Sequence, residues 1–247
     1  MDRLQVEENI ILYGTTGSRA YGTHTPDSDY DKMGVFVEPK DYVMGLYEIQ
    51  HSTDKTEGSD NTAYSLRKFV RLAAKGNPTV MELLWLPHYD IKTPVGDIVR
   101  NFREYFVSKD SGKRYLGYLH SQKQSLTGQK THAVKRPDLI ERYGYDTKFA
   151  MHAVRLGMQG IEFLSEGRIK LPIQGDDLKT LLAIRSGKFS KIEVLEIIDD
   201  LEADLNHCID RCTLKVDTDY INKQLIAAYE LHWELQDWKM IDWNINS

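Results

Sequence analysis

The stretch that decides the fold is ILYGTTGSRAYGTHTPDSDYDKMGVFV, residues 11–37. It contains an apolar segment, a glycine-rich turn, a D-x-D pair and a second apolar segment. The two apolar segments predict β-strands on either side of the turn. Because alternate strand residues point to the same side, we expect Asp29 and Asp31 on one side and Tyr30 on the other. Two carboxylates this close repel each other, so a cation or solvent is expected beside them.

The turn before the aspartates has the composition of a phosphate site. Gly17 lets the backbone approach a phosphate closely, and Ser18 offers a hydroxyl and an amide as donors. A helix that starts near Ser18 would add further free amides. Two converging carboxylates suit a hard cation such as Mg²⁺, which also binds phosphate oxygens. Each part alone is common in surface turns, but the ordered combination predicts a phosphate and metal site.

Composition bounds the remaining possibilities. The 247 residues suffice for one large domain or two small ones, with 41% hydrophobic and 28% charged residues. A formal net charge of −5 argues against binding nucleic acid through a global positive field, while a local basic groove stays compatible. Without a signal-peptide core or a membrane-length apolar run, the chain is expected to be soluble and cytoplasmic, with no membrane partner. Cys208 and Cys212 are expected to be core side chains.

The order of the predicted elements indicates an α+β fold. Strands are expected at residues 9–14 and 30–37, and a further strand, or a strand and a turn, at 41–50. The polar segment at 51–64 is expected to be a hairpin connection that leads into another strand. Helices are expected at residues 65–76, 77–87, 95–110, 113–126, 146–167, 190–212 and 219–236. This layout predicts a small mixed-sheet domain at residues 1–100, followed by a helical domain at 101–247 that closes a cleft.

Several helix ends are signalled by capping residues. Asp146 is expected to be an N-cap and Gly167 a stop, and Ser190 with Glu193 forms a capping-box pattern. Asn77 is expected to cap a helix that begins at the following proline. Glu82, in the same helix, is expected to be a paired structural carboxylate, and the alternative is that Asn77 and Glu82 reach the cleft.

The segment GSRAYGTHTPDSDYDKMGVF, residues 17–36, resembles the signature of the polymerase-beta-type nucleotidyltransferase superfamily. It is similar in particular to the RlaP branch, which is associated with RNA repair. Later blocks at residues 64–87, 148–172 and 183–195 also resemble that branch. The resemblance implies nucleotide binding and nucleotidyl transfer.

The resemblance also implies three carboxylates that hold two Mg²⁺ ions, with Mn²⁺ as the alternative metal. Asp29 and Asp31 match the first two carboxylates. The third is expected on a later strand of the same sheet: Asp60 matches best by position, Glu57 is the second choice and Asp54 a distant third. Asp60 would also help to deprotonate the attacking hydroxyl.

A polar stripe on the helix at 146–167 is the candidate phosphate-binding surface. Lys148, His152, Arg155 and Gln159 have the spacing i, i+4, i+7 and i+11, which is one helical face. Such a face suits a triphosphate opposite the metal site, and the alternative is an exposed, solvated face.

Two residues after the glycine are further nucleotide-binding candidates. Arg19 is expected to contact a phosphate, and Tyr21 either stacks on the nucleotide or packs in the core. A basic connector is the local candidate for gripping a nucleic-acid backbone, with a solvated loop as the alternative; its cations are Lys130, His132, Lys135 and Arg136.

The expected function is transfer of a nucleoside monophosphate from an NTP to a hydroxyl, with release of pyrophosphate. The resemblance favours an RNA or tRNA end as the acceptor, while the acidic charge leaves room for a protein or small-molecule hydroxyl. One rival is a non-catalytic nucleotide-binding regulator of the same fold. The other is a partner-binding protein that uses an exposed apolar stripe at residues 190–236. The sequence does not specify the base of the NTP or the oligomeric state.

Overall fold

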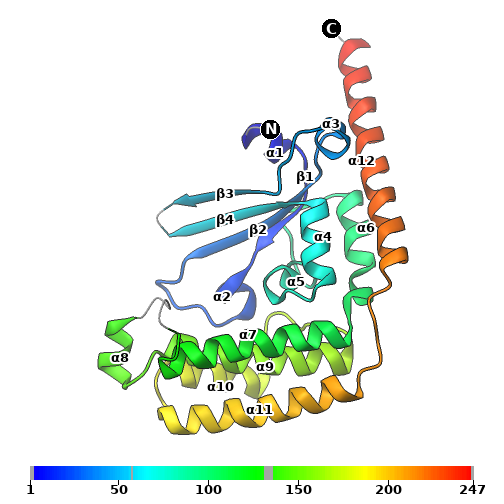
Figure 1. Ribbon diagram of the computed structural model, residues 1–247. Helices are drawn as coiled ribbons and strands as arrows, with labels where there is room; N and C mark the ends of the chain where they lie inside the picture. The colour runs from blue at the N-terminus through cyan, green and yellow to red at the C-terminus, as the bar shows by residue number, and fades with distance from the viewer. Residues whose placement is uncertain (1–2, 57, 131–135, 246–247) are drawn as a thin grey trace.

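The computed structural model describes residues 3–56, 58–130 and 136–245. A mixed sheet formed mainly by the N-terminal part of the chain lies above a layer of long helices, and the C-terminal helix runs beside the sheet (Figure 1). The strands of the sheet are β1 Ile10–Thr15, β2 Tyr30–Phe36, β3 His51–Thr56, β4 Ser59–Ser65 and β5 Ile91–Lys92. Their order is β3-β4-β2-β1-β5. β2 and β4 are parallel, whereas the other neighbouring strands are antiparallel. The predicted α+β class with a mixed sheet is confirmed.

Helices occupy most of the remaining described chain. They are α1 Arg3–Glu8, α2 Gly17–Tyr21, α3 Lys40–Met44, α4 Leu66–Ala74, α5 Pro78–Leu84, α6 Pro94–Asn101, the 3-10 helix η1 Arg103–Phe106, α7 Lys109–Thr127, α8 Pro137–Tyr143, α9 Thr147–Glu166, α10 Gly175–Arg185, α11 Lys191–Arg211 and α12 Thr218–Ile245. Helices α7, α9 and α11 pack on one another, and α10 packs on α9. Among the described residues, no helix has both the length and the apolar character needed to cross a bilayer.

The predicted capping residues occupy the helix ends. Asp146 accepts hydrogen bonds from the amides of Lys148 and Phe149 at 3.0 and 3.2 Å, and Gly167 ends α9 in the left-handed conformation. Ser190 and Glu193 form the reciprocal capping box of α11. These local signals therefore fixed the start of α11 and both ends of α9, the helix that carries the predicted phosphate-binding stripe.

The prediction of a strand at residues 41–50 is wrong. Helix α3 occupies residues 40–44, and the following residues to 50 form no regular element. Pro39 precedes the helix with its fixed φ, and Asp41 places a negative charge in the first turn, where the helix dipole favours it. The apolar residues of this segment misled the prediction because a five-residue helix also tolerates them.

The polar segment at 51–64 holds more regular structure than predicted. It forms β3 and β4, which pair as antiparallel strands. β3 lies at the edge of the sheet, where polar side chains remain in solvent and protect the edge from pairing. The predicted helix at 95–110 likewise divides into α6, η1 and the start of α7.

One apolar core runs from the sheet to the helical layer. Val35 on β2, Phe69 on α4 and Phe163 on α9 are fully buried members of the same cluster. Burial of side chains of this size contributes roughly 1.5–3 kcal/mol each. The core therefore holds α9 at a fixed distance from the sheet.

The C-terminal helix returns to the N-terminal unit. Tyr229 on α12 donates a hydrogen bond to the Glu38 carboxylate at 2.6 Å, and the Trp233 indole donates to the Glu38 carbonyl at 3.0 Å. Glu38 is buried, and α12 packs on α4 and α6. The last helix of the predicted second domain thus lies on the first, and the division at residue 100 remains a prediction.

Candidate functional site

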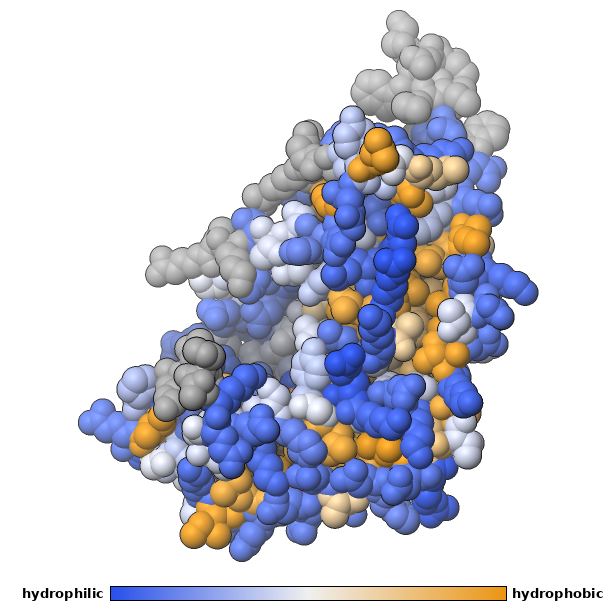
Figure 2. Space-filling model, in the orientation of Figure 1, coloured by the Kyte–Doolittle hydropathy of each residue, from blue (hydrophilic) through white to orange (hydrophobic). Residues whose placement is uncertain are grey.

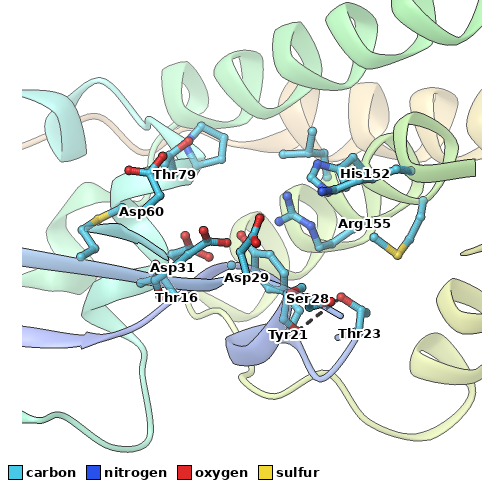
Figure 3. Close-up of a pocket in the computed structure, with 18 of the residues that line it drawn as sticks. Thr16, Tyr21, Thr23, Ser28, Asp29, Asp31, Asp60, Thr79, His152 and Arg155 are labelled. Atoms are coloured by element: carbon cyan, nitrogen blue, oxygen red, sulfur yellow. Dashed lines mark hydrogen bonds between the residues drawn. The ribbon is translucent and has the colours of Figure 1, made fainter. Parts of the chain in front are cut away.

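A cavity of about 580 Å³ lies between the ends of β2 and β4 and the face of α9. Asp29, Asp31 and Asp60 line its sheet side, and His152 and Arg155 face them from α9 (Figure 3). The cavity therefore has an acidic wall and a basic wall, which come from segments more than eighty residues apart.

The register of two parallel strands brings the carboxylates together. Asp31 on β2 pairs directly with Asp60 on β4, so both side chains leave the same face of the sheet. Burial raises the pKa of Asp31, and the nearby Asp29 and Asp60 raise it further. Asp54 pairs with Asn61, one position out of phase, and therefore lies on the opposite face.

Of the alternatives for the third carboxylate, Glu57 lies outside the described residues. Asp60 is the one that the structure places beside Asp31. No strand propensity in EGSDNTAY signals this placement, because the strand is stabilised by pairing with β2 and β3 rather than by its own side chains.

The Gly-Ser turn packs directly on the D-x-D segment. The Thr16 amide donates to the Asp31 carbonyl at 2.8 Å. Gly17 has a φ of +65°, and a Cβ at this position would overlap a carboxylate oxygen of Asp31. Glycine is therefore required here for its conformation and also for its lack of a side chain. Ser18, the next residue, lines the cavity.

Tyr21 and Glu82 form the floor of the cavity. Both are buried and line it. Burial raises the Glu82 pKa to about 7, although the Tyr21 hydroxyl, the nearby Arg155 and the Gly17 amide each lower it. The structure places Glu82 at the cavity, the alternative to the favoured interpretation as a paired structural carboxylate, and beside the Gly17 amide of the Gly-Ser turn.

The predicted polar stripe of α9 faces this cavity at three of its four positions. Lys148, His152 and Arg155 line it. Burial, with the neighbouring cations Arg155 and Lys148 next in effect, lowers the His152 pKa to about 3, so the imidazole is neutral near pH 7. Burial also lowers the pKa of Lys148, while Asp29 and Asp31 oppose that shift. The wall therefore offers two cations and a neutral hydrogen-bonding ring.

The guanidinium group of Arg155 is held in place by Tyr21 and Gln159. Its guanidinium lies 3.9 Å from the centre of the Tyr21 ring and donates to the Gln159 side chain at 2.6 Å. Gln159 is buried, and its role is to orient Arg155. The Nε atom of Arg155 is buried and has no hydrogen-bond partner among the described residues. The guanidinium thus keeps unused donor capacity at the cavity wall.

Arg19 is placed differently from its prediction as a phosphate contact. It does not line the cavity formed by the described residues. Its guanidinium lies 3.5 Å from the centre of the Tyr30 ring and donates to the carbonyls of Ser28 and Asp29 at 2.9 and 3.3 Å. Arg19 therefore fixes the turn that presents Asp29.

Several lining residues were not among the sequence candidates, and three of them lie on the helical layer: Arg185 on α10, and Tyr118 and Gln122 on α7. Arg185 lies in the block at 183–195 that resembled the family, so that block was the available signal. No pattern marked Tyr118 or Gln122, since they reach the cavity only through the packing of α7 against α9.

The basic connector is only partly described. Its His132 and Lys135 lie outside the described residues. Lys130 donates to the Ser121 hydroxyl at 2.8 Å, and Arg136 pairs with Asp146 at 3.1 Å. Arg136 therefore stabilises the start of α9, and the connector's role in gripping nucleic acid remains a prediction.

The acidic wall fits a hard divalent cation by its chemistry. All its donors are carboxylate oxygens, and their mutual repulsion is what a cation would relieve. As the side chains stand, no three His, Cys, Asp or Glu groups within the described ranges are gathered closely enough to enclose an ion. A metal at this wall is therefore a proposal that rests on donor type and charge.

The large apolar side chains exposed at 190–236 do not form a single stripe. Ile192 begins α11, Leu214 lies in the following linker, and Ile226 and Leu235 lie on α12. The buried side of α11 packs on α7 and α9. The partner-binding rival thus gains no support from this segment.

Two curated relatives match part of the chain. One is an uncharacterised 38.9 kDa protein in the nrdC-mobD intergenic region of Enterobacteria phage T4, 31% identical over 134 residues, which is 48% of this chain and 40% of the relative. The other is the uncharacterised protein YcgL of Bacillus subtilis (strain 168), 30% identical over 154 residues, which is 55% of this chain and 57% of the relative. The match thus spans about half the length of these relatives. A family model described as RlaP, the RNA repair pathway DNA polymerase beta family, matches residues 2–228, and the chain therefore belongs to that family.

Proposed function

We propose that this protein is a metal-dependent nucleotidyltransferase. It moves a nucleoside monophosphate from an NTP to a hydroxyl group, and pyrophosphate leaves. The observation that carries the proposal is the pairing of Asp31 with Asp60 opposite the cations of α9 across one cavity. A metal ion would neutralise the negative charge of the acidic wall, and a triphosphate would neutralise the positive charge of the basic wall.

The basic wall would bind the triphosphate. Lys148, Arg155 and Arg185 supply positive charge, and the neutral His152 can donate a hydrogen bond without a change of protonation near pH 7. Gly17 and Ser18 would lie against the β- and γ-phosphates, where the backbone approaches closely. Arg19 would act indirectly, because its hydrogen bond to the Asp29 carbonyl holds the turn in which Asp29 lies.

Asp29, Asp31 and Asp60 would hold Mg²⁺ or Mn²⁺, which when bound would shield the phosphate charge and acidify the attacking hydroxyl. In the transfer, the hydroxyl oxygen bonds to the α-phosphorus, and the bond from that phosphorus to the β-phosphate oxygen breaks. Pyrophosphate takes the electron pair, and the hydroxyl proton goes to Asp60. Asp60 would take this role because it lines the cavity beside Asp31, within the same group of carboxylates.

The proposed acceptor is an RNA or tRNA end. The family description names an RNA repair pathway, and this supports the choice. The net charge of −5 requires that such an acceptor bind to a local basic surface.

The deciding experiment uses each α-labelled NTP with Mg²⁺ and three acceptor pools: total tRNA, short RNA and protein. We expect label in RNA with the wild type and none with Asp31→Ala. Label in protein, or in no acceptor but in a small product, would replace the proposed acceptor while keeping the chemistry.

A matched binding measurement separates the enzyme from a nucleotide-binding regulator. Titration calorimetry with ATP and Mg²⁺ is expected to give metal-dependent binding that the Asp29→Asn, Asp31→Asn double variant loses. If no pool is labelled by the wild type and the double variant binds ATP as well as the wild type does, the proposed function is wrong.

A further inference from the structure

A row of cations crosses the surface beside the acidic wall. Helix α4 and its end carry positive charges without an acidic residue between positions 66 and 75, and α7 adds two more. We call this set the basic track: Arg67, Lys68, Arg71, Lys75, Lys113 and Arg114. It lies on a chain whose formal net charge is −5, so the track is a local reversal of the overall charge. Figure 2 shows strongly hydrophilic side chains running down this face over α4.

The track follows two hollows that neighbour the cavity. The first, about 560 Å³, lies between the segment at 42–50 and α4, and the second, about 620 Å³, lies between the end of α4 and α7. Lys75 lines both hollows, and Tyr118 lines the second hollow and also the carboxylate cavity. Glu38 and Glu48 also line the first hollow and Asp110 the second, so the cations outnumber the carboxylates without excluding them. The shared lining residues place the three hollows next to one another.

The path reaches the cavity on the side of Asp60. Tyr64 lies on β4 four residues after Asp60, on the same face of the sheet, and lines the cavity. Burial raises the pKa of Tyr64, and the nearby Tyr118 and Asp60 raise it further. The cations of α9 and α10 lie on the other wall. A strand on the track would therefore arrive opposite the triphosphate rather than compete with it.

Two of the six cations of the track have no side-chain partner among the described residues, and the other four make weak or exposed contacts. The guanidinium groups of Arg67 and Arg114 donate to the carbonyls of Val43 and Lys75 at 3.5 and 3.4 Å. Arg71 and Lys75 are exposed, and among the described residues neither has a carboxylate within ion-pair distance. Lys68 donates to the Gln50 amide at 2.8 Å, and Lys113 pairs with Asp110 at 3.1 Å on the surface. Exposed pairs of this kind contribute about 0–1 kcal/mol, so a phosphate can replace such a partner at low cost.

The far end of the track carries exposed rings. Tyr47 is 66% exposed, and its ring centre lies 5.3 Å from that of Tyr42. Nearby Met44 and Leu46 are also exposed. Aromatic faces beside a row of cations are the usual means of binding single strands, because bases stack on rings while phosphates contact cations.

We propose that the basic track binds a single-stranded nucleic acid as the acceptor strand. Its phosphates contact Arg71, Lys75 and Arg114, its bases stack on Tyr47, and its terminal hydroxyl passes Tyr118 to Asp60. Binding to the track stands on its own, whereas delivery of the hydroxyl rests on the proposed function. The partner is a flexible strand because the path bends from α4 onto α7, which a rigid duplex would not follow.

The test is fluorescence anisotropy with a short labelled single-stranded RNA on the full chain, without NTP or metal. The track variant is Arg71→Gln with Lys75→Gln. The matched control is Lys188→Gln with Lys223→Gln, two exposed lysines on α10–α11 and α12 that remove the same charge elsewhere. Thermal unfolding checks that all variants fold.

We expect the track variant to bind the RNA about tenfold or more weakly at low salt, and the control to bind as the wild type does. The slope of log K against log salt should fall by about 1.4, since each contact with a single-strand phosphate contributes about 0.7. Tyr47→Ala should weaken binding with the slope unchanged. Single-stranded DNA and a polyglutamate of equal charge serve as competitors.

The proposal is overturned if the track variant binds like the wild type, if the control loses as much affinity, or if polyglutamate competes as well as RNA does. If DNA competes as well as RNA does, the track is still a binding surface for single strands, and its partner is either RNA or DNA. If the track binds RNA but no NMP is transferred, the proposed function fails and the track stands. If transfer occurs and the track variant keeps its KM for RNA, the function stands and the track fails.

Discussion

Replacement of Gly17 by alanine tests the central geometric claim, that the Gly-Ser turn touches the D-x-D segment. Gly17 has a φ of +65°, where an alanine side chain costs about 1–2 kcal/mol. Loss of glycine flexibility in the unfolded chain returns about 0.4–1 kcal/mol. The added Cβ would also overlap a carboxylate oxygen of Asp31, and such overpacking costs about 1–3 kcal/mol. The expected destabilisation is therefore about 2–4 kcal/mol.

The chain offers a matched control in Gly175. This residue also has a φ of +65°, and a Cβ there meets no atom within 4 Å. For Gly175→Ala only the cost of the positive φ and the lower entropy of the unfolded chain matter, and we expect a destabilisation of about 0.5–1 kcal/mol. Urea unfolding gives the free energy of unfolding of both variants, and ATP titration with Mg²⁺ gives their binding. Gly17→Ala should also lose at least about tenfold in ATP affinity, because Asp31 must move. Equal destabilisation of the two variants, with ATP binding retained in both, would refute the contact between Gly17 and Asp31.

Three further outcomes follow from the charges of the cavity. Asp31→Asn should abolish nucleotidyl transfer yet stabilise the metal-free protein by roughly 0.5 kcal/mol in urea unfolding, because it relieves partly screened repulsion from Asp29 and Asp60; a destabilised variant would contradict this. Burial raises the pKa of Glu82 to about 7, so the folded state binds its proton more tightly than the unfolded state does. The free energy of unfolding of the wild type therefore falls as the pH rises from about 5 to about 7. Glu82→Gln should therefore gain stability relative to the wild type over this window, by on the order of 2 kcal/mol, and a pH-independent difference would argue against the raised pKa. His152, with its pKa lowered to about 3, should contribute no step to the pH profile of kcat/KM between about pH 5 and about pH 8; the loss of an acidic limb in His152→Asn would show that the imidazole titrates there.

Many helices could be predicted from the sequence because their ends and buried faces depend on residues that are close in the chain. Capping residues such as Asp146 and Ser190 mark helix ends through hydrogen bonds within one turn, and apolar spacing marks the buried faces. The prediction for 41–50 was wrong because it took apolar residues as a sign of a buried strand, whereas Met44, Leu46 and Tyr47 are exposed. β3 was not recognised because an edge strand keeps polar side chains in solvent.

The candidate site also has features that follow from local sequence and features that depend on tertiary packing. The sequence by itself determined that Asp29 and Asp31 share a side and that Lys148, His152 and Arg155 share a face, because both follow from the periods of a strand and a helix. Only the tertiary structure decided that these two sets oppose each other, since strands β2 and β4 and helix α9 meet through a common core. It also decided that Asp60 rather than Asp54 stands beside Asp31, because strand register assigns alternate residues to opposite faces. The positions of Arg185 and Tyr118 were not predicted from the sequence for the same reason: each reaches the cavity through the packing of a different helix.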